Sequence, residues 1–218
     1  MTSISTELVG ATAIDTERLT LLPLRVAYAE EMAAVLADPA LYAHTGGTPP
    51  TVEELRTRYA RQTAGSPDPE VVWGTWMIGI REEAQEEGQR SAESCAGSSA
   101  GHGPTGHVLA GHVLAGHVLA GHVLAGYVQA TIGPDGDGRT AELAWVVGTA
   151  WQGRGIATEA ARGLVRWLKG QGVRSLVAHI HPDHGASAAV AKAVGLAPTG
   201  ERHDGEVRWS GLALTADR

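Results

Sequence analysis

A glycine-rich segment, Gln152-Gly153-Arg154-Gly155-Ile156-Ala157, lies between a predicted strand and a predicted helix. Its small residues at 153, 155 and 157 allow a ligand to approach the main chain closely. The first amides of a helix have no partner within the helix, so the helix start can bind a phosphate group, and Arg154 adds positive charge. An ordinary strand-to-helix turn is the alternative. A dinucleotide-binding fingerprint is excluded, because G-x-G-x-x-G does not occur here.

Three closely spaced histidines form a second candidate site. His179 and His181 share one face of a predicted strand, and His184 follows after a turn. This spacing is compatible with a polar strand end, with an imidazole that lines an amine pocket as an alternative base, or with a three-histidine metal site. The polar strand end is the simplest interpretation, and we expect no metal.

The elements that must position these residues follow from hydrophobic periodicity and from turn and cap residues. Strands are predicted at 17–25, 71–80, 126–132, 140–148, 173–182 and 206–214, and helices at 27–38, 49–62, 187–195 and from 156 to the glycines at 170 and 172. Thr51 and Glu54 have the spacing of a capping box at the start of the second helix. This order predicts one α/β domain over residues 1–218, with a mixed central sheet flanked by helices.

Composition limits the class of protein. The chain has 218 residues, 43% of them hydrophobic, which is enough for a sizeable core. Its 17 basic and 24 acidic residues give a net charge of −7, which argues against a nucleic-acid partner. The single cysteine, Cys95, cannot form an intrachain disulfide, and the first residues lack a secretory signal. We therefore expect a cytoplasmic protein.

Residues 81–125 are predicted to be a flexible acidic linker followed by a repeat insertion within the domain. The sequence GHVLA occurs four times from 106 to 125 and then decays into GYVQA at 126–130. A five-residue period matches neither a strand nor a helix, so the histidines do not align into a metal site, and their polarity argues against a membrane span. We interpret the repeat as a tandem duplication of the segment that enters a core strand. Its β-prone copies also suggest sheet-edge pairing in a homo-oligomer.

The glycine-rich segment resembles the acetyl-CoA motif Q/R-x-x-G-x-G/A of the GNAT acetyltransferase superfamily, with Gln152, Gly155 and Ala157 at its defined positions. The chain is most similar to the branch that acetylates the N-termini of ribosomal proteins. The resemblance implies that acetyl-CoA is the co-substrate and that two main-chain segments bind it. The pantetheine arm would pair with Trp145, Val146 and Val147, and the pyrophosphate would bind Gln152, Gly153, Arg154, Gly155, Ile156, Ala157 and Thr158.

A second similarity lies at 184–196, where the family has a helix that starts with N-x-x-S. His184 replaces the asparagine and Ser187 matches the serine, so both are expected at the cofactor. The tyrosine that is frequently the family's acid falls at Ala191. A thiol of pKa about 8.5 costs only about 2 kcal/mol to expel unprotonated at pH 7, so water or the Ser187 hydroxyl suffices as the acid.

Glu142 is the candidate general base, because it lies on the strand before the motif and matches the family's glutamate there. The alternative is a solvent-exposed or arginine-paired carboxylate. An α-amine of pKa about 8 is roughly 10% neutral at pH 7, whereas a lysine of pKa about 10.4 is less than about 0.1% neutral. We therefore expect transfer of acetyl to a protein or peptide N-terminus. The alternatives are a small amine, such as a polyamine or an aminoglycoside-like compound, and a non-catalytic acyl-CoA-binding module.

Overall fold

The computed structural model describes residues 12–81, 122–136 and 138–212. The strands are β1 (Ile14–Asp15), β2 (Leu19–Pro23), β3 (Val72–Arg81), β4 (His122–Asp135), β5 (Gly138–Val147), β6 (Ser175–Ile180), β7 (Ala197–His203) and β8 (Glu206–Leu212). The α-helices are α2 (Ala29–Val35), α3 (Val52–Thr63), α5 (Ile156–Gly170) and α6 (Gly185–Ala193), and the short 3-10 helices are η1 (Val26–Tyr28), η2 (Pro39–Tyr42) and η3 (Thr149–Trp151).

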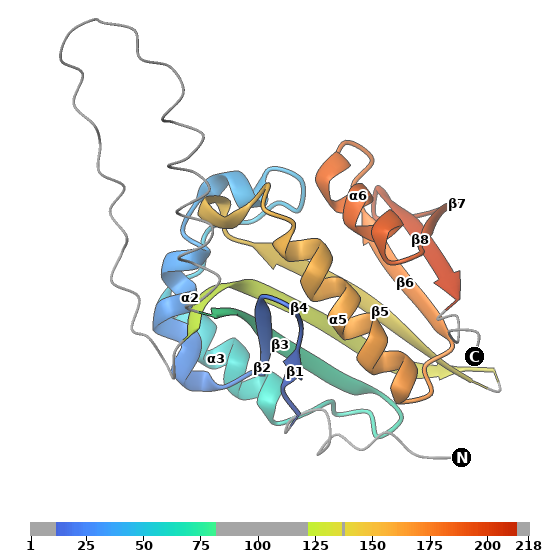
Figure 1. Ribbon diagram of the computed structural model, residues 1–218, viewed down its shortest axis with the longest axis horizontal. Coiled ribbons are helices and arrows are strands. Elements are labelled where there is room, and N and C mark those ends of the chain that lie inside the picture. Colours follow the sequence, from blue (N-terminus) through green and yellow to red (C-terminus); the bar gives the residue numbers. More distant parts are fainter. Residues whose placement is uncertain (1–11, 82–121, 137, 213–218) are drawn as a thin grey trace, which may run out of the picture.

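All of these strands belong to one sheet, in the order β1-β2-β3-β4-β5-β6-β8-β7 (Figure 1). Neighbouring strands are antiparallel except β5 and β6, which are parallel. The prediction of an α/β domain with a mixed sheet flanked by helices is therefore confirmed. Within the part of the chain that the structure describes, no helix is both long and apolar enough to cross a membrane.

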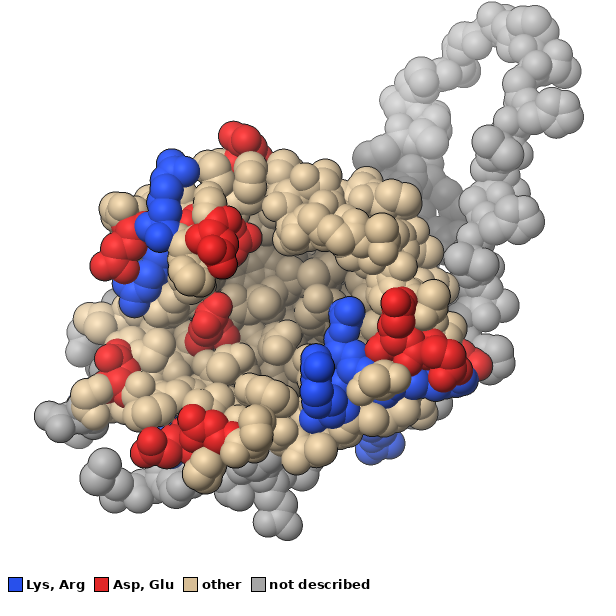
Figure 2. All heavy atoms as spheres, turned by 180° about the vertical axis from the view of Figure 1, so that it is seen from behind, with Lys and Arg blue, Asp and Glu red and all other residues tan. Residues whose placement is uncertain are grey.

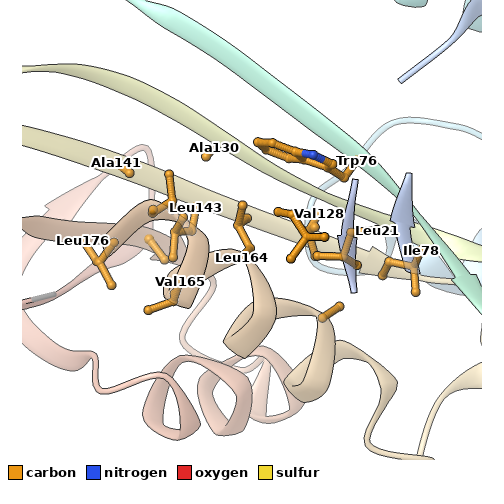
Figure 3. Close-up of a cluster of buried hydrophobic side chains, with 14 of the residues drawn as sticks. Leu21, Trp76, Ile78, Val128, Ala130, Ala141, Leu143, Leu164, Val165 and Leu176 are labelled. Atoms are coloured by element: carbon orange, nitrogen blue, oxygen red, sulfur yellow. The ribbon is translucent and has the colours of Figure 1, made fainter. Parts of the chain in front are cut away.

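The main core lies between α5 and one face of the sheet. Figure 3 shows Leu164 and Val165 of α5 beside sheet residues such as Val128 and Leu143. These side chains are almost fully buried. The apolar residues of α5 recur every three or four positions, as predicted, and this spacing gives the helix one apolar face.

The opposite face of the sheet is covered only at one end. There α2 and α3 pack through Met32, Leu55 and Tyr59 against Met77 of β3. The predicted capping box starts α3: Thr51 accepts a hydrogen bond from the Glu54 amide, and Glu54 accepts one from the Thr51 amide. The remainder of this face, over β5, β6 and β8, has no helix among the described residues.

Two boundaries of the predicted insertion, residues 81–125, are wrong. Arg81 is the last residue of β3, and β4 begins at His122, so most of the fourth GHVLA copy is part of a core strand. The physical reason is burial: Leu124 packs in the cluster under α2 and α3, and Ala125 packs in the cluster under α5. The acidic linker, Cys95 and the first three copies of the repeat lie outside the described residues.

A β-bulge interrupts β4 where the repeat decays. Ile78 is opposite Gly126, but the next pair is Gly79 with Leu124, which leaves Ala125 as the extra residue. The Leu124 amide donates a 2.9 Å hydrogen bond to a Glu31 carboxylate oxygen from α2. A bulge bends its strand and increases the local twist. Here it lies beside the last residues of β5, because Gly126 is also opposite Val147.

Candidate active site

The two parallel strands separate in the middle of the sheet. Pairing of β5 with β6 runs from Thr140–Ser175 to Glu142–Val177 and stops there. β5 then continues to Val147 and β6 to Ile180, and Figure 1 shows the strands diverging. The β6 side of Trp145–Val147 therefore faces an opening, where main-chain groups can pair with an extended ligand.

The glycine-rich loop lies at the end of β5, as predicted, and leads into α5. Gly153 and Gly155 have φ values of +73° and +74°, a left-handed conformation that favours glycine. A Cβ added at Gly153 would meet nothing within 4 Å, so this part of the loop is open. The exposed Arg154 guanidinium lies 5.3 Å from the Trp151 ring centroid. This geometry suits an anion placed against the loop amides.

The predicted cofactor residues in this segment differ in what their side chains can do. The Gln152 amide donates a 2.9 Å hydrogen bond to the Val147 carbonyl, so this side chain holds the loop against β5. Ile156 is buried in the core, which leaves only its main chain for a ligand. Ala157 and Thr158 lie half-buried in the first turn of α5.

Arg18 and Glu159 hold this loop from a distant part of the sequence, and sequence reasoning missed both. Glu159 accepts hydrogen bonds from the Thr16 hydroxyl at 2.6 Å and from the Arg18 amide and Nε, each at 2.7 Å. Arg18 also donates to the Arg154 carbonyl at 3.2 Å. The acidic residue in the first turn of α5 was a visible signal, but its partners are about 140 positions away.

Glu159→Gln is expected to lower the free energy of unfolding by about 1–3 kcal/mol at neutral pH. Burial alone would raise the pKa of Glu159, but its hydrogen bonds from Thr16 and Arg18 outweigh that effect and hold the pKa below its ordinary value. A lowered carboxyl pKa stabilises the fold above about pH 4.5 and loses that contribution as the pH falls through the folded-state pKa. Urea unfolding from pH 7 to pH 3 should therefore show the difference between Glu159→Gln and wild type shrinking.

The control for this prediction is Glu70→Gln, which changes an exposed carboxylate in the loop before β3. It should leave the free energy of unfolding within about 0.5 kcal/mol of wild type at every pH. A Glu159→Gln deficit that stays constant from pH 7 to pH 3 would contradict the assignment to the ionised carboxylate.

The α6 side of the opening carries Ser187 and His184, as predicted. The Trp145 indole donates a 3.3 Å hydrogen bond to the Ser187 hydroxyl, which links β5 to α6 on the face that α5 covers. His184 lies at the start of α6 and stacks on His44, with ring centroids 4.5 Å apart. His181 lies 5.4 Å from the same His44 ring. Sequence reasoning missed His44, because it comes from the segment after η2.

Burial lowers the pKa of His184, and the neighbouring His44 and His181 lower it further. His184 is therefore a neutral ring near pH 7, so it offers a hydrogen bond and a stacking surface to a ligand instead of a charge. The predicted alternative of a metal held by His179, His181 and His184 finds no support. Among the described residues, no group of three or more histidine, cysteine or acidic side chains is arranged to bind a metal.

Glu142 and His179 form a pair on the opposite face of the sheet from Ser187. The His179 Nδ1 lies 3.0 Å from a Glu142 carboxylate oxygen. The Glu142 side chain is 55% exposed, so it can contact a substrate, whereas His179 is only 21% exposed. Both line an open cavity of about 540 Å³, together with Glu201, Arg202, His203 and Arg208.

This arrangement puts the Glu142 carboxylate on one side of the opening and the Ser187 hydroxyl on the other. Glu142 and Trp145 are three positions apart on β5, so their side chains leave opposite faces of the sheet. A thioester that enters along the α6 side and an amine that enters from the Glu142 side would meet where β5 and β6 separate. Such a site suits acyl transfer to an amine.

The family model described as an acetyltransferase (GNAT) domain matches residues 105–197. Over these residues the expected resemblance to the GNAT acetyltransferase superfamily is confirmed. No curated protein sequence matches it significantly.

Solved structures share the fold over nearly the whole chain. A GNAT-family acetyltransferase from Bacillus anthracis is 16% identical, with a TM-score of 0.61 over 93% of this chain and 99% of that one. RimL, a ribosomal L7/L12 alpha-N-protein acetyltransferase in complex with coenzyme A, is 13% identical, with a TM-score of 0.62 over 92% and 98%. The microcin C7 self-immunity acetyltransferase MccE, in complex with acetyl-CoA and AMP, is 15% identical, with a TM-score of 0.60 over 90% and 93%.

Proposed function

We propose that this protein transfers the acetyl group of acetyl-CoA to a primary amine, preferably the N-terminus of a protein or peptide. The observation that carries this proposal is the opening between β5 and β6. It has the glycine-rich loop and α6 on one side and the Glu142–His179 pair on the other. The preference for a protein acceptor is supported further by the fold shared with RimL, which acts on a protein N-terminus.

Acetyl-CoA would bind in two parts. The pantetheine arm would lie along the Trp145–Val147 main chain, and the pyrophosphate would lie against the amides of residues 152–158. Glycines at 153 and 155 remove the side chains that would block this approach, and Arg154 supplies positive charge. His184 and Ser187 would line the side of the channel formed by α6.

The reaction needs a neutral amine, a group that takes a proton from its nitrogen, and a group that gives a proton to the leaving thiolate. The amine nitrogen attacks the thioester carbon, Glu142 takes a proton from the nitrogen, and the C–S bond breaks as the amide forms. The thiolate of coenzyme A then takes a proton from water or from the Ser187 hydroxyl. Because the Ser187 oxygen accepts from Trp145, its own proton remains available for donation.

A small polycationic amine is the second candidate acceptor. Glu142 and Glu201 line one cavity and could both bind ammonium groups. Arg202 and Arg208 line the same cavity and would repel additional positive charge, so we favour a singly charged α-amine. A non-catalytic acyl-CoA-binding module is the alternative from another class.

The test is release of coenzyme A thiol from acetyl-CoA with a panel of N-terminal peptides, lysine peptides, polyamines and aminoglycosides. Release that depends on an α-amine peptide and yields N-terminally acetylated product by mass spectrometry supports the proposal. Release with polyamines or aminoglycosides only would show that the acceptor is a small amine and not a protein N-terminus. Measurable acetyl-CoA binding with no release for any acceptor would favour the binding module.

A further inference from the structure

A second cavity lies on the same face of the sheet as Glu142, between the sheet and α3. It has a volume of about 60 Å³, room for a few water-sized groups and hence for a carboxylate. Its lining combines apolar residues with polar and basic ones: Leu36, Leu55, Arg58, Tyr59, Gln62, Thr75, Met77, Tyr127 and Gln129. No acidic side chain is among them, and several are hydrogen-bond donors.

Two hydroxyls in this cavity are buried without a partner. Tyr59 is only 3% exposed, and its hydroxyl has no hydrogen-bond partner among the described residues. The same holds for the hydroxyl of Thr75 on β3. A buried hydroxyl that lacks a partner destabilises the fold, so a ligand that accepts hydrogen bonds from both would bind favourably.

Arg58 gives the cavity a positive charge. It faces Tyr42, Tyr59 and Tyr127 closely enough to oppose the rise in their pKa values that burial causes. Within the described ranges, no acidic side chain forms an ion pair with Arg58, whereas Arg56 on the same helix pairs with Glu30 and Glu53. The nearest carboxylate effect is at Glu54, whose pKa is lowered mainly by hydrogen bonds with Thr51 and further by Arg58. A guanidinium beside two hydroxyl donors suits a carboxylate.

The strand register places this cavity within reach of Glu142. Glu142 is opposite Thr131 of β4, and two residues along β4 lies Gln129, which is itself opposite Thr75 of β3. With about 3.4 Å per residue and about 4.8 Å between strands, Gln129 lies about 8 Å from Glu142 and Thr75 about 12 Å. An extended peptide covers this range in about two to four residues.

The floor between the two cavities is unobstructed. Ala144 is opposite Gln129, lies two residues beyond Glu142 and is exposed. Figure 2 shows this face hollowed between the charged side chains over α3 and those over β7 and β8. An extended chain can therefore run from Glu142 across Ala144 to the cavity under α3.

We propose that the cavity under α3 binds a carboxylate of the acceptor, so that the preferred substrates are peptides with aspartate or glutamate at the second or third residue. This inference rests on the proposed function, because it takes the amine to lie at Glu142. It adds a specificity subsite formed by Arg58, Tyr59 and Thr75.

The experiment uses the full chain and peptide pairs that differ only by aspartate or asparagine at position two or three. For wild type, kcat/KM should be about tenfold higher for an aspartate peptide than for its asparagine partner. Arg58→Met should abolish this preference. Arg61→Met, on the same helix but outside the cavity, should keep the preference. Tyr59→Phe should reduce it.

Calorimetric binding of the same peptides to the protein saturated with coenzyme A separates this inference from the proposed function. Tighter binding of the aspartate peptide that Arg58→Met removes supports the subsite, even if no peptide is acetylated and the proposed function fails. Acetylation of both peptides with equal kcat/KM and equal affinity overturns the subsite while the proposed function stands. A preference for the aspartate peptide that survives Arg58→Met also overturns the subsite.

Discussion

Glu142→Gln is expected to lower kcat/KM for the amine acceptor by at least about tenfold and to leave acetyl-CoA affinity unchanged. The physical reason is that the amide cannot accept the proton that the attacking nitrogen must lose. The carboxylate lies on the face opposite Ser187, away from the loop that would bind the pyrophosphate, so cofactor binding is spared. Steady-state kinetics with the best acceptor measure kcat/KM, and calorimetry with acetyl-CoA measures the affinity for the cofactor.

Comparison of variants at saturating acceptor identifies the base. The acidic limb of kcat/KM includes protonation of the acceptor amine, so kcat is the quantity to compare, and Glu142→Gln should lower it most. His179→Asn keeps a donor toward Glu142 and should cost less than Glu142→Gln. Glu201→Gln changes a carboxylate in the same cavity that pairs with Arg208, and should have little effect on kcat. A larger loss in His179→Asn than in Glu142→Gln would assign the base to the imidazole.

Gly126→Ala is expected to destabilise the protein by about 3 kcal/mol, which corresponds to a fall in Tm of about 6–12 °C. A Cβ at this position would lie 2.0 Å from the Val146 carbonyl oxygen and 2.9 Å from the Val147 Cα. These atoms belong to the main chain of β5, so either β4 or β5 must move. Chemical and thermal unfolding of the variant and of wild type measure the loss.

The consequence of Gly126→Ala should extend to acetyl-CoA binding. Val146 and Val147 belong to the main-chain segment on which the pantetheine arm is proposed to lie, and a shift there changes the opening. Gly170→Ala is the matched control, because a Cβ there meets nothing within 4 Å at the end of α5. That variant should be neutral or up to about 1 kcal/mol more stable. Equal stability of the two variants would contradict the prediction and show that β5 moves to accommodate the added methyl group at little cost.

Local patterns in the sequence were sufficient for most elements and for the place of the glycine-rich loop between β5 and α5. Thr51 and Glu54 predict the start of α3, because a capping box is formed by residues three apart. The spacing of Gln152, Gly155 and Ala157 is the basis of the resemblance to the GNAT acetyltransferases, because the left-handed glycine and the helix start are both local properties of the backbone. Glu142 was selected in the same way, from its place on the strand before that loop.

The features that the sequence did not predict have a common cause: each depends on contacts between residues that are distant in sequence. β7 was not predicted because its residues are mostly polar and exposed, and it exists only by pairing with β8. The repeat letters do not reveal that the fourth copy enters β4, since its place depends on burial of Leu124 and Ala125 against elements that are distant in sequence. Arg18 with Glu159 and His44 with His184 are joined by folding alone.

The sequence by itself was sufficient for the resemblance to the GNAT superfamily, for the glycine-rich loop and for naming Glu142 as a candidate base, because each depends on residue types at short spacing. Only the tertiary structure decided that Glu142 meets His179 on the face opposite Ser187, and that Arg58, Tyr59 and Thr75 line one cavity on the Glu142 face of the sheet. The register of β3, β4, β5 and β6 sets these positions, and register depends on the packing of the whole sheet.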